Sequence, residues 1–127
     1  MNDGLIAFRF RVELFYIRTE EPSILTIESP FELNDNDDLD IMALSAINIT
    51  QTTRIGKAII DRNARRLIIH IAILEPTAEY LSHVIPAHID LLTKMAEHVF
   101  AQYDILIKRD ALLERIQSTI VNCIELV

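Results

Sequence analysis

The side chains of this sequence that could bind a metal ion are its four histidines and their acidic neighbours. Glu79 and His83 are four residues apart, a spacing that places two ligands on one face of a helix, and His88 follows as a third. A metal site usually needs three or four ligands, and Pro86 separates His83 from His88. Surface polar residues are therefore the favoured interpretation, and we predict no metal ion and no cofactor.

Catalytic chemistry has equally few candidates. His70 lies in an apolar stretch, where an imidazole needs a hydrogen-bond partner, and we favour a core or interface histidine over a catalytic one. Cys123 lies in an apolar terminal segment with no histidine near it in sequence, which favours buried packing over a nucleophile. The only glycines, Gly4 and Gly56, exclude a glycine-rich phosphate loop. We predict no catalytic residue and a protein that is not an enzyme.

Composition limits the class of protein further. The chain of 127 residues is long enough for one hydrophobic core and is expected to form a single domain, 1–127. Half of the residues are hydrophobic, which argues against disorder, and the formal net charge of −7 disfavours nucleic-acid binding. A single cysteine excludes an internal disulfide and suits the cytoplasm. No apolar run approaches the roughly 20 residues of a membrane helix, so we predict no membrane insertion.

The N-terminal part reads as β-structure. Leu5 to Arg18 alternates between apolar and polar residues, which predicts one long, half-buried strand that ends at Glu21-Pro22. In this interpretation Phe15 and Ile17 lie on the polar face. Residues 23–28 form a second, shorter strand, which Pro30 closes.

The most apolar strand of the chain is expected over Arg65 to Pro76. Its odd-numbered and its even-numbered residues are both largely apolar, so both faces must be covered. The C-terminal helices of the chain can cover one face. Too little of the chain remains for the other face, which we expect a partner subunit to cover.

The region between these strands allows more than one interpretation. The acidic run 34–40 reads as an exposed connector that also caps the next element, because it lacks the glycine and the final glutamate of a calcium loop. Residues 41–61 could begin with a helical stripe, but their β-branched content favours a long strand with an irregularity at Gly56. A hairpin loop should then lead into the apolar strand, and three arginines near that loop read as solvated charge rather than an anion site: Arg62, Arg65 and Arg66.

The C-terminal part reads as helix. Residues 77–85 could form a short helical segment, Pro86 suits a first helical turn, and an amphipathic helix is expected over 87–102. Asp110 can cap a last helix, and 119–127 could end as helix or strand. The predicted fold class is α+β: an antiparallel sheet of about four long strands followed by C-terminal helices packed on one face, with 1–75 mostly β and 76–127 mostly α.

One resemblance suggests a function. Ile85-Pro86, followed by the helix AHIDLLTKMAEHV, is similar to the start of the long helix in the SecB family of export chaperones. Residues 103–107, residues 110–113 and the opening strand 8–16 also resemble that family. Members of the family are acidic cytoplasmic proteins that assemble as dimers of dimers and hold unfolded polypeptides in apolar grooves. The resemblance implies a SecB-like α+β fold and a homo-oligomer.

We therefore expect a non-enzymatic, oligomeric, SecB-like chaperone or adaptor that binds unfolded or extended polypeptide segments. Its partner would be an unfolded polypeptide or a dedicated protein, and the chain would form a dimer or tetramer. Two alternatives stay open: a structural or assembly subunit of a larger complex, and an enzyme that uses His70 or the group around His83. The candidate groove or interface residues are Phe15, Ile17, His70, Tyr80 and Phe100.

Overall fold

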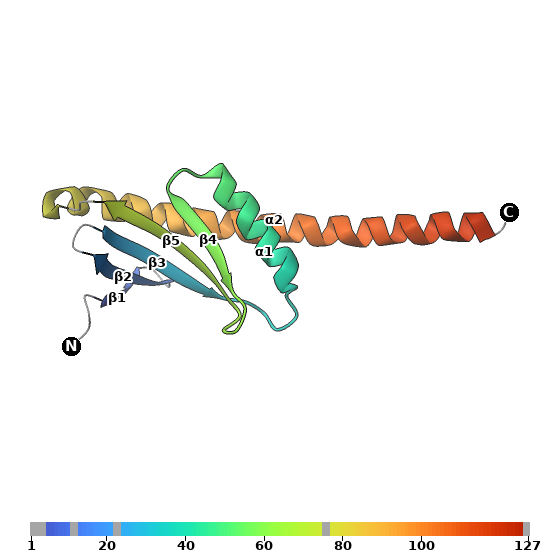
Figure 1. The fold of residues 1–127 in the computed structure, drawn as a ribbon, viewed down its shortest axis with the longest axis horizontal. Helices are drawn as coiled ribbons and strands as arrows, with labels where there is room; N and C mark the ends of the chain where they lie inside the picture. Colours follow the sequence, from blue (N-terminus) through green and yellow to red (C-terminus); the bar gives the residue numbers. More distant parts are fainter. Residues whose placement is uncertain (1–4, 11–12, 22–23, 75–76, 126–127) are drawn as a thin grey trace.

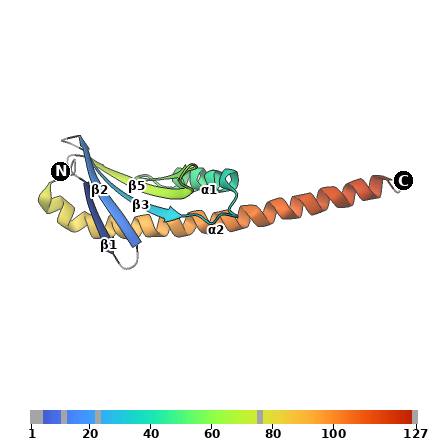
Figure 2. The same cartoon turned by 90° about the horizontal axis from the view of Figure 1, so that it is seen from below.

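The computed structural model describes residues 5–10, 13–21, 24–74 and 77–125. Five antiparallel strands form one sheet in the order β1-β2-β3-β5-β4, and two helices lie against it (Figures 1 and 2). The predicted α+β class, with helix packed on an antiparallel sheet, is confirmed. The elements are β1 (Leu5–Phe10), β2 (Glu13–Glu21), β3 (Ile24–Glu32), α1 (Leu39–Thr52), β4 (Gly56–Asp61), β5 (Arg66–Leu74) and α2 (Ala78–Glu125).

The core lies between one face of the sheet and α2. The odd-numbered residues of β5 are buried from Leu67 to Ile73, and β3 contributes Ile27 beside Ile71. From α2, Leu92 and Val99 enter the same cluster with no exposed surface. A strand that buries one face repeats its buried residues every second position, whereas an amphipathic helix repeats them about every 3.6 positions. β5 and α2 show these two periods.

The opposite face of the sheet is the open face, defined by the even-numbered residues of β3 and β5 together with Lys57 and Ile59 of β4. Ile68 and His70 are half-buried there, and Ile59 is 49% exposed. The expectation that the chain covers only one side of its most apolar strand is therefore confirmed for the part of the chain that the structure describes. Cover from a partner subunit stays a prediction.

The single long strand predicted over 5–18 is wrong. It is two strands: β1 ends at Phe10, β2 begins at Glu13, and the two pair antiparallel. Reversal of the chain changes which residues share a face, so Phe15 pairs with Phe8 and stacks on it at 5.5 Å between ring centroids. Phe15 therefore lies on the core side and is fully buried. Residues 11 and 12 of the predicted strand lie outside the described residues.

The strand favoured over 41–61 is also wrong, because residues 39–52 form α1. Asp38 caps this helix, and its Oδ1 accepts hydrogen bonds from the backbone N–H groups of Asp40 and Ile41. Ser45 donates to the carbonyl oxygen of Val99 at 2.6 Å, which joins α1 to α2. The cap and this tertiary contact outweigh the β-branched composition of the segment. The described part of the region 1–75 is therefore β-structure with one inserted helix.

α1 also protects an edge of the sheet. The Thr50 hydroxyl accepts a hydrogen bond from the N–H of Ala58 at 2.9 Å and donates to the carbonyl of the same residue at 3.4 Å. β4 is an outer strand, and an uncovered edge is a template for association with other chains. Gly56, expected at an irregularity, instead begins β4 in regular register. A side chain there would collide with the Met95 sulfur, so the glycine permits close packing of α2.

The C-terminal part is one helix, α2, that runs through Pro86, rather than several helices. The stripe predicted for 87–102 is confirmed, because its members Ile89, Leu92, Ala96, Val99 and Tyr103 are all buried. Residues 119–125 continue as helix and not as strand. Beyond Ile107, α2 leaves the sheet and projects into solvent (Figures 1 and 2).

Phe15→Ala is expected to lower the free energy of unfolding by about 3–5 kcal/mol, because a large, fully buried ring is lost from the core. Urea unfolding followed by circular dichroism measures the change. Ile6→Ala, on β1 and 59% exposed, is the control and should change stability by less than about 0.5 kcal/mol. Equal effects of the two substitutions would contradict the assignment of Phe15 to the core.

Asp38→Ala should destabilise the fold by about 0.5–2 kcal/mol, because it removes the acceptor for the first N–H groups of α1. Asp38→Asn keeps an acceptor oxygen at the same place and should retain most of the stability. Chemical denaturation of the three proteins gives the comparison. An unchanged stability in Asp38→Ala would argue against the cap.

Candidate functional site

The site best suited to bind a ligand lies where β2 and β3 separate. β2 pairs with β3 as far as Tyr16 opposite Glu28, whereas β3 continues beside β5 to Glu32 opposite Arg66. Among the described residues, 30–32 of β3 therefore have a partner strand on one side only. This also explains why Pro30, expected to end its strand, lies inside β3: a residue without a donor is tolerated at an unpaired edge.

The hydrogen-bond pattern shows which backbone groups face the unpaired edge. The N–H of Leu33 donates to the carbonyl of Arg65, so the odd-numbered residues of β3 direct their backbone groups toward β5. The alternation of an antiparallel ladder then turns the even-numbered residues the other way. The carbonyl of Pro30 and both backbone groups of Glu32 consequently face a side without a partner strand.

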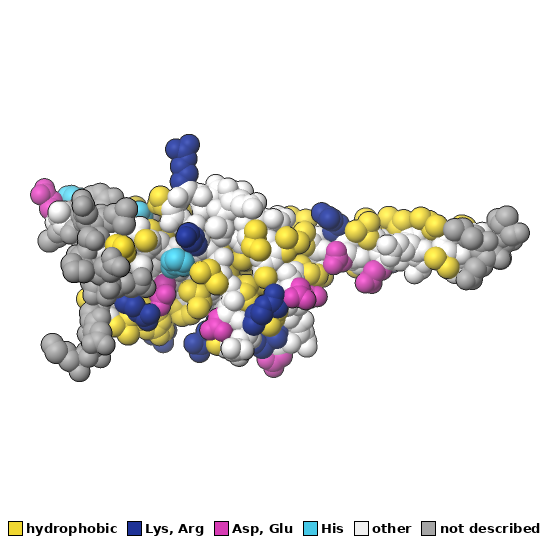
Figure 3. Space-filling view, viewed as in Figure 1, with side chains coloured by type: hydrophobic (Ala, Val, Ile, Leu, Met, Phe, Trp, Pro, Cys, Tyr) yellow, Lys and Arg dark blue, Asp and Glu magenta, His cyan; other side chains and the backbone are white. Residues whose placement is uncertain are grey.

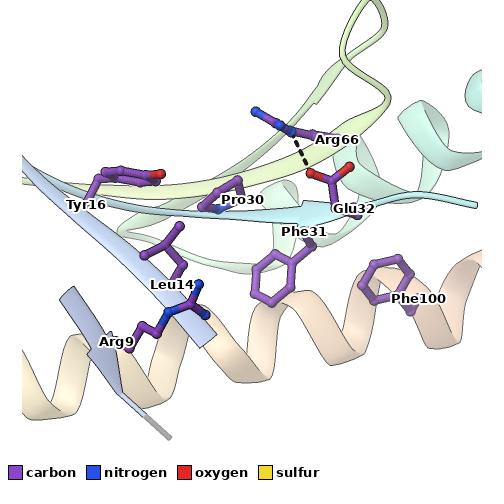
Figure 4. Close-up of a pocket in the computed structure, with 8 residues that line it drawn as sticks. All are labelled: Arg9, Leu14, Tyr16, Pro30, Phe31, Glu32, Arg66 and Phe100. Atoms are coloured by element: carbon purple, nitrogen blue, oxygen red, sulfur yellow. Dashed lines mark hydrogen bonds and ion pairs between the residues drawn. The ribbon is translucent and has the colours of Figure 1, made fainter. Parts of the chain in front are cut away.

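An open cavity of about 390 Å³ surrounds this edge (Figure 4). Its apolar wall combines Phe31 of β3 and Phe100 of α2, whose rings meet edge to face at 6.4 Å between centroids. Side chains from the other strands complete the wall, so that the cavity includes residues from both sides of β3. The lining residues are Arg9, Leu14, Tyr16, Pro30, Phe31, Glu32, Arg66 and Phe100.

The charged groups of the cavity are not equivalent. Arg66 Nε donates to Glu32 Oε1 at 2.8 Å, so this guanidinium already has a carboxylate partner (Figure 4). Arg9 is exposed, extends from β1 toward the cavity, and forms no ion pair with any described residue. The cavity therefore offers an aromatic wall beside a cation that is free to meet a carboxylate of a ligand.

The structure separates the candidate residues that the sequence suggested. Phe100 lies in the cavity wall. Phe15 is fully buried in the core, and Ile17 is half-buried against it, so neither lies in a groove. His70 lies on the open face, between Glu28 and Lys57 in the register of the sheet. Tyr80 belongs to α2, but its side chain lies outside the described residues.

The side chains that were considered as possible metal ligands, and not favoured as such, do not form a cluster. Glu79 and His83 are exposed on α2 and His88 is half-buried. Across the described residues, no group of three or more histidine, cysteine, aspartate or glutamate side chains is arranged to hold a metal ion. Cys123, expected to be buried, is exposed on the projecting part of α2. Among these same residues, no helix has both the length and the apolar character needed to cross a membrane.

The arginines near the predicted hairpin loop are engaged within the fold. The hairpin itself is confirmed, since Asp61 at the end of β4 pairs with Arg66 at the start of β5. Arg62 forms an ion pair with Asp40, and Arg65 donates from Nη2 to three backbone carbonyls of the acidic run, those of residues 34, 35 and 37. The acidic run is a connector that leads into the cap of α1, as expected.

Sequence reasoning missed Arg9, Leu14 and Phe31 as parts of a site. One signal for the cavity was present: a proline within an otherwise strand-like stretch marks an edge of a sheet. This proline could not indicate that Phe100, seventy residues later, completes the apolar wall of the cavity.

The chain matches no protein-family model, and no curated protein matches it. Among solved structures, it is similar to the one described as "Crystal structure of YbjN, a putative transcription regulator from E. coli". The two chains are 13% identical, the match covers 84% of each, and the TM-score is 0.49. This similarity concerns the arrangement of helices and strands only.

The SecB resemblance is wrong. The solved structure reported above is described as "YbjN, a putative transcription regulator", and not as an export chaperone. The elements that carried the resemblance also differ in the structure: α1 interrupts the strands, the opening strand is a hairpin pair, and Ile85-Pro86 lies within α2 instead of starting a helix. An apolar periodicity shared by many helices explains the misleading similarity.

Proposed function

We propose that this protein is a non-enzymatic adaptor or chaperone that binds an extended segment of another polypeptide at the cavity beside residues 30–32 of β3. The observation that carries the proposal is a cavity with an aromatic wall placed directly at a strand edge that has no partner strand among the described residues. Extended peptides commonly bind by adding a strand to such an edge, where backbone hydrogen bonds supply affinity and adjacent pockets supply specificity.

The lining residues suggest what the segment contains. Phe31 and Phe100 favour one bulky apolar side chain, since aromatic walls contribute much of the energy of a small interface. Arg9, without an ion-pair partner among the described residues, favours a carboxylate next to that side chain. The expected partner is therefore an extended, acidic-apolar segment of a protein.

The enzymatic alternative has less support. The polar groups of the cavity are two arginines, one glutamate and one tyrosine, of which Arg66 and Glu32 neutralise each other. No general base stands beside a nucleophile in this set, whereas a binding role needs only the apolar wall and the free cation.

Arg9→Glu is expected to weaken binding of a fluorescent acidic-apolar peptide at least about tenfold, because a carboxylate replaces the cation that meets the ligand. Fluorescence anisotropy at low ionic strength measures the affinity. Lys57→Glu is the matched control: it makes the same change of charge at an exposed position of β4 outside the cavity, and should alter the affinity less than about threefold. Equal losses in both variants would show a non-specific charge effect and contradict the proposal.

Glu32→Gln should have the opposite effect. It releases Arg66 from its ion pair and is expected to strengthen binding of the same peptide by roughly threefold to tenfold. The cost to stability should stay below about 1 kcal/mol, since the pair is solvent-exposed. A peptide with lysines in place of its acidic residues should not gain affinity from this substitution.

A reduced, permanently unfolded model polypeptide and its folded form distinguish a general chaperone from an adaptor for one partner. Capture of the unfolded form alone, reduced by Phe100→Ser, supports the chaperone role. Binding of the acidic-apolar peptide without capture of the unfolded chain supports the adaptor role. Failure to bind either ligand contradicts the proposed function.

A further inference from the structure

The helical arm, residues 108–125 of α2, extends beyond the sheet for about 27 Å at the rise of an α-helix (Figure 1). Every residue from Lys108 to Cys123 is exposed, so no contact with the described residues buries this part of the arm. Helical segments of this length are marginally stable in water unless an apolar face is packed against something.

The arm is amphipathic. Figure 3 shows hydrophobic side chains running along one side of its surface. Leu113, Ile116, Ile120 and Cys123 follow one another at spacings of three, four and three residues, the pattern of a coiled-coil seam, and Leu112 flanks them. The large side chains are half-exposed: Leu112 55%, Leu113 45%, Ile116 45% and Ile120 52%. We define these five residues as the arm stripe.

We propose that the arm stripe pairs with the same stripe of a second copy of this chain, in antiparallel orientation. This inference does not depend on the proposed peptide-binding function. A two-fold interface needs a surface that is complementary to itself, and the stripe meets that requirement. With the two-fold axis near Ser118, Ile116 faces the partner's Ile120, and Leu113 faces the partner's Cys123.

Charge decides the orientation. Arg109 precedes Leu113 by four residues and so lies on the continuation of the stripe. A parallel pair would bring the two Arg109 guanidinium groups together beside the seam, where like charges repel. An antiparallel pair instead places Lys108 and Arg109 at the C-terminal end of the partner's helix, which carries a negative partial charge and no basic residue in its last turn.

The shape of the molecule favours the same orientation. The sheet lies at one end of α2 and the arm at the other (Figure 2). Antiparallel arms therefore hold the two sheets at opposite ends of the pair, and with the axis near Ser118 each arm covers residues 111–125 of the other. The cavity at β3 stays accessible in both copies, because Phe100, its α2 residue, precedes the arm.

Size-exclusion chromatography with light scattering should give twice the 14.6 kDa mass of the chain. Ile116→Glu should raise the dissociation constant of the dimer at least about tenfold, because each copy then places an unpaired charge in the seam. Val121→Glu is the control: Val121 is 51% exposed but lies off the stripe, so this variant should remain a dimer. Circular dichroism checks that both variants keep their helix. A monomeric wild-type chain, or a dimer that Ile116→Glu leaves intact, would overturn the proposal.

Disulfide formation at the single native cysteine tests the orientation. In antiparallel arms the two Cys123 thiols are separated by about 15 Å along the axis, beyond disulfide reach, so the oxidised wild type should not crosslink. Leu113→Cys should crosslink to the partner's Cys123, and Leu113→Cys with Cys123→Ser should not. Crosslinking of the wild type through Cys123 would indicate parallel arms and overturn the orientation. So would a Leu113→Cys variant that stays a dimer by light scattering but does not crosslink.

Discussion

The fold depends on the contact between α2 and the buried side of β5. Leu67, Ile69 and Ile71 have almost no exposed surface, and the side chains of Leu92 and Val99 complete the same cluster. When helices cover only one face of a sheet, every strand must bury its core residues on that face. The contact between α2 and β5 therefore determines the buried side of every other strand. β1 and β2 conform to it, because Phe8 and Phe15 stack on the same side.

One edge of the sheet is covered by a helix, whereas a stretch of β3 is not covered. α1 closes the β4 edge through Thr50 and is itself held to α2 by two hydrogen bonds, from Ser45 to the Val99 carbonyl and from the Asp38 N–H to the Tyr103 hydroxyl. The divergence of β2 leaves one side of residues 30–32 of β3 without a partner strand among the described residues, while the other side pairs with β5. Proteins usually protect such edges, so an unprotected stretch beside an apolar cavity fits a surface used for binding.

The two surfaces proposed to bind other chains, the cavity at β3 and the arm stripe, differ in character. The cavity combines an aromatic wall with an arginine and is suited to a short segment of another protein. The arm stripe is a regular row of aliphatic side chains at helical spacing and is suited to another helix. Because α2 joins the two, a pair that forms through its arms would present two cavities, one in each copy.

Sequence pattern alone determined the class of the fold, the apolar character of β5, the buried stripe of α2 and the hairpin before β5, because each rests on a local periodicity or a turn signal.

Prediction from the sequence failed where a local pattern was compatible with two structures. Residues 41–52 contain enough β-branched side chains to read as a strand. The Asp38 cap, the hydrogen bond from Ser45 to Val99 and the burial of Met42 and Ala46 in the core stabilise the helix instead. Residues 5–18 alternate throughout, yet a chain reversal between Phe10 and Glu13 transfers Phe15 to the core. The cavity could not be predicted from the sequence. Its walls come from β1, β2, β3, β5 and α2, and only tertiary packing brings residues so distant in the chain to one edge.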